Sequence, residues 1–199
     1  QERARQKKSL NEKYDKEIKS FVGNKDWIAM LKMDGLTCSL LYEGGRLIKA
    51  ETRGDGEIGE DITHNARVIP SIPNRIPYTD RLVVDGEIIC KLNDFKEFEG
   101  EYKNARNFAS GSIRLLDSNE CAKRKLTFVA WDVIGKPKSN SLGAVLNWLY
   151  DLSFIVVPFV WRNSYSVENT LWLKQIAEDY GYPIDGLVFK LDNPIEYEL

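Results

Sequence analysis

Apolar and polar residues near the N-terminus alternate with the period of an amphipathic helix. Ser9 is followed three residues later by Glu12, which is the spacing of a capping box. Apolar residues then recur at helical spacing, at Leu10, Tyr14, Ile18 and Val22. The pattern predicts a helix over residues 9–22, ended by the Gly23-Asn24 break.

Further along the chain the period changes to that of strands. Leu36, Cys38, Leu40 and Tyr42 alternate with other residues, and Gly44-Gly45 predicts a tight turn into the next strand. A turn is expected at residues 33–35. We expect strands at 27–32, 36–42, 46–52, 81–90, 126–133, 154–160 and 186–191. Helices are expected at 92–102, 142–152 and 167–180, and a glycine-rich loop at 53–61 leads into a further short helix. Because strands and helices follow no regular βαβ order, the pattern indicates an α+β fold built on antiparallel sheets.

Composition narrows the class of protein. With 43% hydrophobic and 11% aromatic residues, the 199-residue chain can bury a globular core. Its longest apolar run, 154–161, is interrupted by a proline and is too short to span a membrane, and the polar, basic N-terminus does not resemble a signal peptide. We therefore expect a cytoplasmic protein with no membrane partner.

The reactive residue types are restricted. Cys38, Cys90 and Cys121 are widely separated and form neither a zinc half-site nor a disulfide framework. His64 is the only histidine, so chemistry must rest on Lys, Arg, Asp and Glu. We expect these four residues to be structural, and we expect no direct protein ligand for a metal.

Local charge departs from the net charge of −2. Residues 101–125 carry basic side chains at Lys103, Arg106, Arg114, Lys123, Arg124 and Lys125, against acidic ones at Glu101, Asp117 and Glu120. This segment is the best candidate for contacting phosphates, although a solvated charged face explains the composition equally well.

Lys32-Met33-Asp34-Gly35 is the sharpest local motif. A lysine at a strand end, beside a turn that can meet a ligand, can act as an amine nucleophile where its surroundings favour the neutral form. A surface lysine in a turn is the commoner explanation for an isolated tetrapeptide of this kind.

Four further motifs follow in order, and together with the first they resemble those of the NAD-dependent DNA ligases. They are TRGDGEIGED at 52–61, DGEI at 85–88, NARNFASGSIRLLD at 104–117 and IDGLVFK at 184–190. The resemblance extends over about residues 9–193. It implies a covalent nucleotidyltransferase fold, with antiparallel sheets flanked by helices and a nucleotide pocket between them.

By this resemblance, Lys32 attacks the α-phosphate of NAD, forms a Lys-AMP adduct and expels nicotinamide mononucleotide. AMP then passes to the 5′-phosphate of nicked double-stranded DNA, and the 3′-hydroxyl displaces it to seal the strand. Positioning and charge neutralisation drive such steps. Mg²⁺ is the expected metal, held largely through water and phosphate.

The resemblance also assigns roles around Lys32. Glu87 would accept from a ribose hydroxyl or hold a hydrated metal, and Lys190 would neutralise the α-phosphate and assist Lys32 as a catalytic residue. Arg53 would approach the nucleotide, and Asp34 would order the turn and the catalytic lysine. For Glu87, Lys190 and Arg53, the competing explanations are an exposed strand carboxylate, a solvated edge-strand lysine and a plain surface loop.

Other assignments concern the base and the DNA. Trp131 occupies the position that stacks on adenine, with a buried strand tryptophan as the alternative. Arg106 and Arg114 match arginines that grip nick phosphates, with salt bridges inside their own helix as a rival explanation. Ser9 and Leu10 would border the adenine pocket, with helix capping as the simpler account for Ser9.

Three departures from the family pattern bear on function. Met30 stands where the family has a glutamate that binds the adenine amino group, so base selectivity is expected to be weaker or to come from backbone carbonyls. Residues before Ser9 are too few for the module that binds the nicotinamide half. The chain also stops before the final lysine motif, the OB-fold, the zinc module and the helix-hairpin-helix region.

We therefore expect an N-terminal helical segment at 1–25 and an adenylation domain at 26–199, from an incomplete ligase or one assisted by a second polypeptide. Two alternatives stay open. One is a ligase core that uses ATP or seals RNA, and the other is a ligase-like module that binds nucleic acid or a partner without catalysis.

Overall fold

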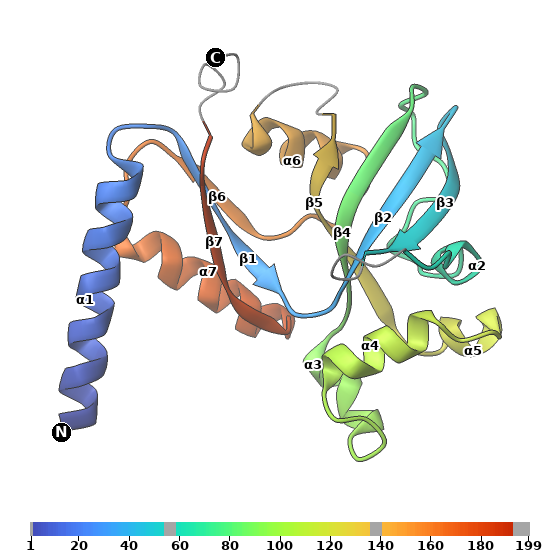
Figure 1. Cartoon of the computed structure of the whole chain (residues 1–199), viewed down its shortest axis with the longest axis horizontal. Helices are drawn as coiled ribbons and strands as arrows, with labels where there is room; N and C mark the ends of the chain where they lie inside the picture. Colours follow the sequence, from blue (N-terminus) through green and yellow to red (C-terminus); the bar gives the residue numbers. More distant parts are fainter. Residues whose placement is uncertain (1, 54–58, 136–140, 193–199) are drawn as a thin grey trace.

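The computed structural model describes residues 2–53, 59–135 and 141–192, without the side chains of residues 2–4 and 6–11. Two antiparallel sheets lie side by side, with helices around them (Figure 1). This confirms the predicted α+β class with antiparallel sheets.

The larger sheet has four strands in the order β3-β2-β4-β5. They are β3 (Arg46–Thr52), β2 (Leu36–Glu43), β4 (Leu82–Cys90) and β5 (Leu126–Ile134). One face of β2 is fully buried, as the predicted alternation requires, at Cys38, Leu40 and Tyr42. The other face carries Thr37, Ser39 and Leu41, which are only partly buried. This second face is the one that faces the cavities described below.

The smaller sheet has the order β6-β1-β7. Its strands are β6 (Phe159–Arg162), β1 (Trp27–Met33) and β7 (Ile184–Leu191). Every residue of the central strand β1 is buried except Lys32. Helix α7 (Val167–Tyr180) packs against β1 and β6. An exposed lysine on an otherwise buried central strand marks this position as unusual.

The predicted turn between the first two strands connects one sheet to the other. After β1 ends at Met33, Asp34 and Gly35 lead directly into β2 of the larger sheet. A Cβ atom at Gly35 would lie 2.1 Å from the Ile88 carbonyl oxygen, so only glycine fits this crossing. The backbone N–H of Asp34 donates to the carbonyl of Pro183 at 2.8 Å. Lys32 therefore lies where the two sheets meet.

Three of the elements predicted from the apolar pattern have other bounds in the structure. Helix α1 (Glu2–Val22) begins seven residues before the predicted start, so Ser9 lies inside the helix and does not cap it. The helix predicted over 92–102 is divided into α3 (Leu92–Phe95) and a 3-10 turn (Lys96–Phe98). The strand predicted over 154–160 forms regular pairing only from Phe159. Val156 makes an isolated bridge to Ala130 before that point.

The remaining helices lie around the larger sheet. They are α2 (Thr63–Ala66), α4 (Ala105–Ile113), α5 (Ser118–Ala122) and α6 (Leu142–Asp151). Helix α4 packs on β4 and α6 packs on β5. None of the helices in the described part of the chain combines the length and the apolar character needed to cross a bilayer.

Candidate active site

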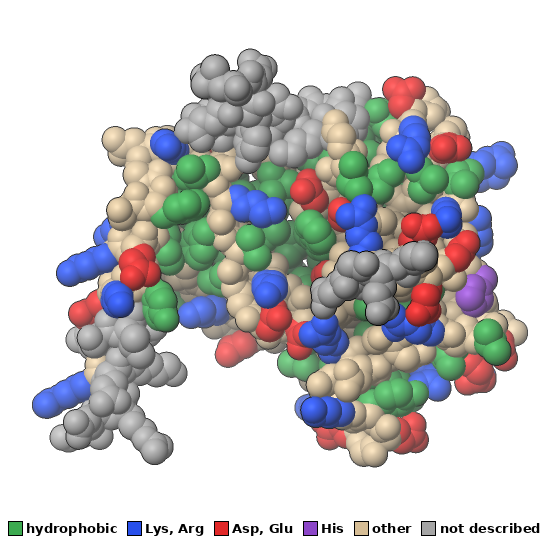
Figure 2. Space-filling model, in the orientation of Figure 1, with side chains coloured by type: hydrophobic (Ala, Val, Ile, Leu, Met, Phe, Trp, Pro, Cys, Tyr) green, Lys and Arg blue, Asp and Glu red, His purple; other side chains and the backbone are tan. Residues whose placement is uncertain are grey.

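A cavity of about 280 Å³ opens between the two sheets. Its lining residues come from β1, β2, β4, β5 and β7, namely Met30, Leu31, Lys32, Met33, Thr37, Glu87, Trp131, Val188 and Lys190. In the space-filling view, hydrophobic side chains gather over β1, β6, β7 and the adjoining edge of the larger sheet, with Lys and Arg side chains around them (Figure 2). The cavity is therefore an apolar slot with a few charged groups.

The smaller sheet supplies one wall. Met30 and Lys32 alternate along β1, and Val188 and Lys190 alternate along β7, so these side chains share a face. In the strand register Met30 pairs with Val188. The two lysines that the sequence nominated thus reach the same cavity from neighbouring antiparallel strands.

Lys32 is accessible and has an acidic neighbour. Its side chain is 60% exposed, and its Nζ lies 3.8 Å from Oδ2 of Asp185. The sequence nominated Asp34 for ordering this lysine, but the Asp34 carboxylate lies 4.0 Å from Nη1 of Arg106. The carboxylate beside Lys32 is that of Asp185, which was considered only as part of the IDGLVFK motif. Pairing of Lys32 with Gly186 brings the motif to the lysine.

The larger sheet supplies the opposite wall with Glu87, Thr37 and Trp131. Thr37 and Glu87 are cross-strand partners, and the Thr37 hydroxyl donates to Oε1 of Glu87 at 2.6 Å. Trp131 also hydrogen-bonds to the Glu87 side chain. Thr37 was not nominated by the sequence, although its position on the cavity face of β2 follows from the strand alternation.

Burial raises the pKa of Glu87 to about 7. The hydrogen bonds from Thr37 and Trp131 and the charge of Arg106 oppose this rise, and the charge of Asp185 adds to it. Glu87 therefore changes its charge near neutral pH, at the centre of the cavity wall.

Arg53 lies in an adjoining cavity of about 390 Å³ on the same face of the larger sheet. Its Nη1 is 3.6 Å from Oδ2 of the buried Asp85, and the Ser39 hydroxyl donates to Oδ1 of Asp85 at 2.5 Å. Thr37 on β2 and Glu87 on β4 line the first cavity. Ser39, two residues after Thr37, and Val83, four residues before Glu87, line the second. The structure thus places Arg53 beside the candidate nucleotide cavity, outside its lining.

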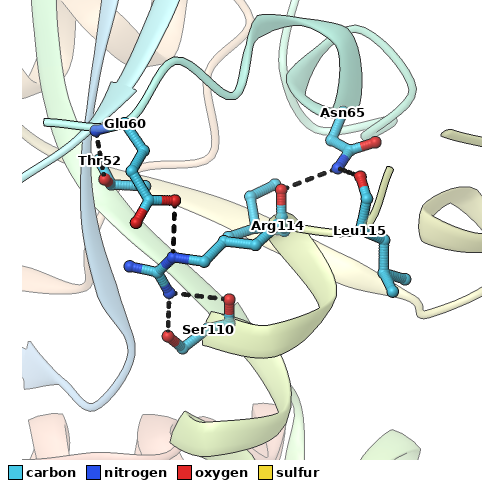
Figure 3. Close-up of polar contacts among 7 residues, drawn as sticks. Thr52, Glu60, Asn65, Ser110, Arg114 and Leu115 are labelled. Atoms are coloured by element: carbon cyan, nitrogen blue, oxygen red, sulfur yellow. Dashed lines mark hydrogen bonds and ion pairs between the residues drawn. The ribbon is translucent and has the colours of Figure 1, made fainter. Parts of the chain in front are cut away.

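Arg114 is held in a defined orientation. Its Nε donates to Oε2 of Glu60 at 3.0 Å, and its Nη1 donates to the carbonyl and hydroxyl oxygens of Ser110 (Figure 3). Glu60 is itself fixed to β3, because its backbone N–H donates to the Thr52 hydroxyl at 3.1 Å. In the described part of the chain, Nη2 of Arg114 has no such partner. The guanidinium therefore keeps one edge available for an anion.

The ion pairs of Arg106 and Arg114 reach other segments of the chain. Arg114 pairs with Glu60 after β3, and Arg106 pairs with Asp34 between β1 and β2. The rival explanation of salt bridges within their own helix therefore fails for the ion pairs. Only the contact of Arg114, the C-cap residue of α4, with Ser110 is local to that helix.

Several nominated residues lie elsewhere. The side chains of Ser9 and Leu10 and the loop at 54–58 lie outside the described residues. Cys38, Cys90 and Cys121 are buried, which raises their thiol pKa values to about 12, 12 and 11. Among the described residues, no cluster of three or more His, Cys, Asp or Glu side chains could hold a metal ion. Glu87 with Thr37 is the oxygen-bearing pair that lines the cavity.

The fold resembles solved structures at low sequence identity. A structure titled Pmar-Lig_PreS3 superimposes with a TM-score of 0.53, at 14% identity, over 90% of this chain and 41% of that chain. Another, titled Pmar-Lig_Pre., gives a TM-score of 0.52 with the same identity and coverage. At this identity the likeness concerns the fold alone.

Relatives among curated proteins share more sequence identity with this chain than these structures do. A DNA ligase of Wolinella succinogenes is 41% identical over 174 residues, covering 81% of this chain and 27% of the relative. A DNA ligase of Malacoplasma penetrans is 37% identical over 203 residues, covering 94% of this chain and 28% of the relative. The chain thus spans less than a third of the length of these curated relatives.

The model of the NAD-dependent DNA ligase adenylation domain matches residues 2–198, nearly the whole chain. This match confirms the family that the five motifs indicated. The chain belongs to the NAD-dependent DNA ligase adenylation domain family.

Proposed function

We propose that this chain catalyses the nucleotidyl-transfer steps of an NAD-dependent DNA ligase, with Lys32 as the residue that carries AMP. The observation that supports this most directly is the convergence of Lys32, Glu87, Trp131 and Lys190 on one cavity. These residues come from four strands of two different sheets, so their meeting does not follow from closeness in the sequence.

In the first step, the Nζ lone pair of Lys32 attacks the α-phosphorus of NAD. A nitrogen–phosphorus bond forms, the bond from that phosphorus to the bridging oxygen breaks, and nicotinamide mononucleotide leaves with the electron pair. The amine must lose a proton for this step, and Asp185 at 3.8 Å is the carboxylate placed to accept it. Lys190 approaches from the neighbouring strand and neutralises charge on the phosphate oxygens.

The cavity fits the nucleotide half of such a substrate. Trp131 offers an aromatic face for adenine, and the apolar wall of Met30 and Val188 lies on the other sheet. Glu87 accepts from a ribose hydroxyl or holds a hydrated cation. One or two carboxylates with water and phosphate are the usual protein environment of Mg²⁺, which would supply further charge neutralisation. Glu87 with Thr37 meets that requirement.

In the later steps AMP moves to the 5′-phosphate of a nicked duplex, and the 3′-hydroxyl displaces it. Arg114 supports this part, because Glu60 and Ser110 fix its orientation and leave Nη2 available for a phosphate oxygen. Arg106 pairs with Asp34 and Arg53 lies in the adjoining cavity, so both carry positive charge near the Lys32 cavity. Sealing also draws on further domains of the ligase or on a second polypeptide, and takes place in the cytoplasm.

A ligase core that uses ATP is the second candidate, because Met30 departs from the glutamate of the NAD-dependent family at this position. Met30 is 3% exposed and lines the cavity. A thioether, and not a carboxylate, is therefore available at this position for the adenine that NAD and ATP share. The family match to residues 2–198 supports NAD. A module that binds without catalysis is disfavoured by the converging lysines.

One experiment tests both the identity of the AMP donor and the transfer of AMP to Lys32. The purified chain is incubated, together with the remaining ligase domains, with Mg²⁺ and either NAD or ATP, and the intact mass of the chain is measured. We expect an added AMP with NAD and an unchanged mass with ATP. Lys32→Ala should abolish both the added mass and the joining of nicked DNA in the presence of the remaining ligase domains, whereas Lys13→Ala on α1 should change neither. An unmodified chain with every donor, with nicked DNA present, would contradict the proposal.

A further inference from the structure

A buried carboxylate connects the two sheets at the end of β7 that lies away from Lys32. Asp192 follows directly after β7 and is 1% exposed. Its Oδ1 accepts from the Leu142 N–H at 2.7 Å, and its Oδ2 accepts from the Gly143 N–H and the Ser141 hydroxyl, both at 2.9 Å. Three donors at the first turn of α6 thus hold a side chain from the smaller sheet.

Helix α6 is the bridge between the sheets. Its body packs against β5 of the larger sheet. Its first turn lies beside the end of β7 (Figure 1), and it also contacts β6, where a Cβ atom at Gly143 would lie 2.3 Å from the Trp161 ring. Through this helix, the end of β7 is fixed relative to β5.

These two strands form opposite walls of the candidate nucleotide cavity. Lys190 is two residues before Asp192 and Val188 is four before it, and both line the cavity from β7. Trp131 lines it from β5. The Asp34–Gly35 crossing fixes the distance between the sheets at Lys32, and backbone hydrogen bonds of Ala130 to residues 155 and 157 link β5 to the segment before β6. The hydrogen bonds of Asp192 supply the link at the end of β7, nearest to Lys190.

We propose that Asp192 is a positioning residue that sets the width of the nucleotide cavity and the place of Lys190 in it, through its hydrogen bonds to the first turn of α6. Asp192 does not touch the substrate. The inference rests on the proposed function, because the readouts are AMP binding and AMP transfer to Lys32. A displacement of about 1 Å in a positioned group is enough to lower a reaction rate by up to about a hundredfold.

The test compares Asp192→Asn and Ser141→Ala with the unaltered chain, each measured well below its unfolding midpoint. The dissociation constant for AMP is measured by calorimetry, and the rate of AMP addition to Lys32 from NAD is measured by mass with the remaining ligase domains present. In Asp192→Asn the amide donor faces either the Leu142 N–H or both the Gly143 N–H and the Ser141 hydroxyl, so we expect AMP affinity and rate to fall about tenfold. Ser141→Ala loses one of three donors, and a fall of about threefold is expected.

Tyr42→Phe is the matched control. Tyr42 is fully buried and donates to the Pro73 carbonyl at 2.6 Å, on the face of β2 that points away from the cavity. Its loss should lower stability and leave AMP affinity unchanged, which separates positioning from general destabilisation.

Wild-type affinity and rate in folded Asp192→Asn would overturn the inference. If that variant fails to fold, unchanged values in Ser141→Ala would overturn it instead. An equal loss of affinity in Tyr42→Phe would also overturn it, because stability would then explain the effect. If the unaltered chain binds no AMP and gains none, the proposed function fails first, and this result is distinct from the others.

Discussion

Glu87→Gln should stabilise the fold at alkaline pH while weakening the site. Burial raises the pKa of Glu87 from 4.5 to about 7, so the folded chain holds a proton at this carboxyl that the unfolded chain has lost. Between those two pH values the native state binds more protons, and stability falls as pH rises. Each pH unit is worth about 1.4 kcal/mol, so the charged carboxylate costs the folded state about 3 kcal/mol at pH 8 and about 1 kcal/mol at pH 5.

The amide in Glu87→Gln has no charge, and its oxygen can still accept from the Thr37 hydroxyl. We therefore expect Glu87→Gln to exceed the wild type in free energy of unfolding by about 3 kcal/mol at pH 8 and by about 1 kcal/mol at pH 5, so that the difference shrinks by about 2 kcal/mol over this range. The same change should reduce AMP transfer to Lys32, as is common where a site sacrifices stability for function.

The assay is urea unfolding followed by tryptophan fluorescence at half-unit steps from pH 5 to pH 8. Glu12→Gln, at an exposed position of α1, is the control of identical chemistry, and its curve should follow that of the wild type. A Glu87→Gln minus wild-type difference that stays constant across this range would refute the reasoning, because it would show that Glu87 does not titrate there.

Three further predictions concern the crossing, the base and the DNA. Gly35→Ala should lower the free energy of unfolding by about 2–3 kcal/mol, since its Cβ would meet the Ile88 carbonyl at 2.1 Å. Substitutions at ordinary surface positions change this free energy by about 0.5 kcal/mol or less, so a change of only that size in urea unfolding would contradict the close contact at the crossing. Met30→Glu should raise the preference for AMP over inosine monophosphate about tenfold or more, measured as a ratio of dissociation constants by calorimetry, and an unaltered ratio would remove Met30 from base recognition. Arg114→Gln should weaken binding to a nicked duplex about tenfold and lower the salt slope by about 1, followed by fluorescence anisotropy. Lys13→Gln is the charge-matched control, and an equal loss there would mean that Arg114 acts only through net charge.

The strands of the fold could be predicted from the sequence, but their assignment to sheets could not. Alternation at 36–42 identified β2 and its buried face. The same alternation gives no information on which strand lies alongside, and the crossing at Gly35 depends on its contact with Ile88, far along the chain. Local pattern therefore defined the strands, and tertiary contacts defined the cavity between them.

Helix α4 is absent from the helices predicted by apolar periodicity, and its sequence and contacts explain why. Its sequence contains Ser110, Gly111 and Ser112, which have low helix propensity. The helix forms because the Asn104 side chain caps its start, accepting from the Asn107 N–H at 2.8 Å, and because it packs on β4, with Phe108 buried against Phe98 and Tyr102. Packing of this kind is not visible in a period of apolar residues.

Only part of the candidate site could be predicted from the sequence. The resemblance to the ligase family nominated Lys32, Glu87, Trp131 and Lys190, and all four line one cavity, although their roles stay predictions. The proximity of Asp185 to Lys32 and the hydrogen bonds of Asp192 to α6 arise from chain segments brought together by folding. The raised pKa of Glu87 likewise comes from burial, which no local pattern reveals.

The most direct test of the account is the position of the attached AMP. After incubation with NAD, Mg²⁺ and the remaining ligase domains, the chain is digested and the modified peptide is sequenced by tandem mass spectrometry at a pH that preserves the phosphoramidate bond. The account predicts AMP on Lys32, and none in the Lys32→Ala chain. AMP on another lysine, or addition that survives Lys32→Ala, would contradict it.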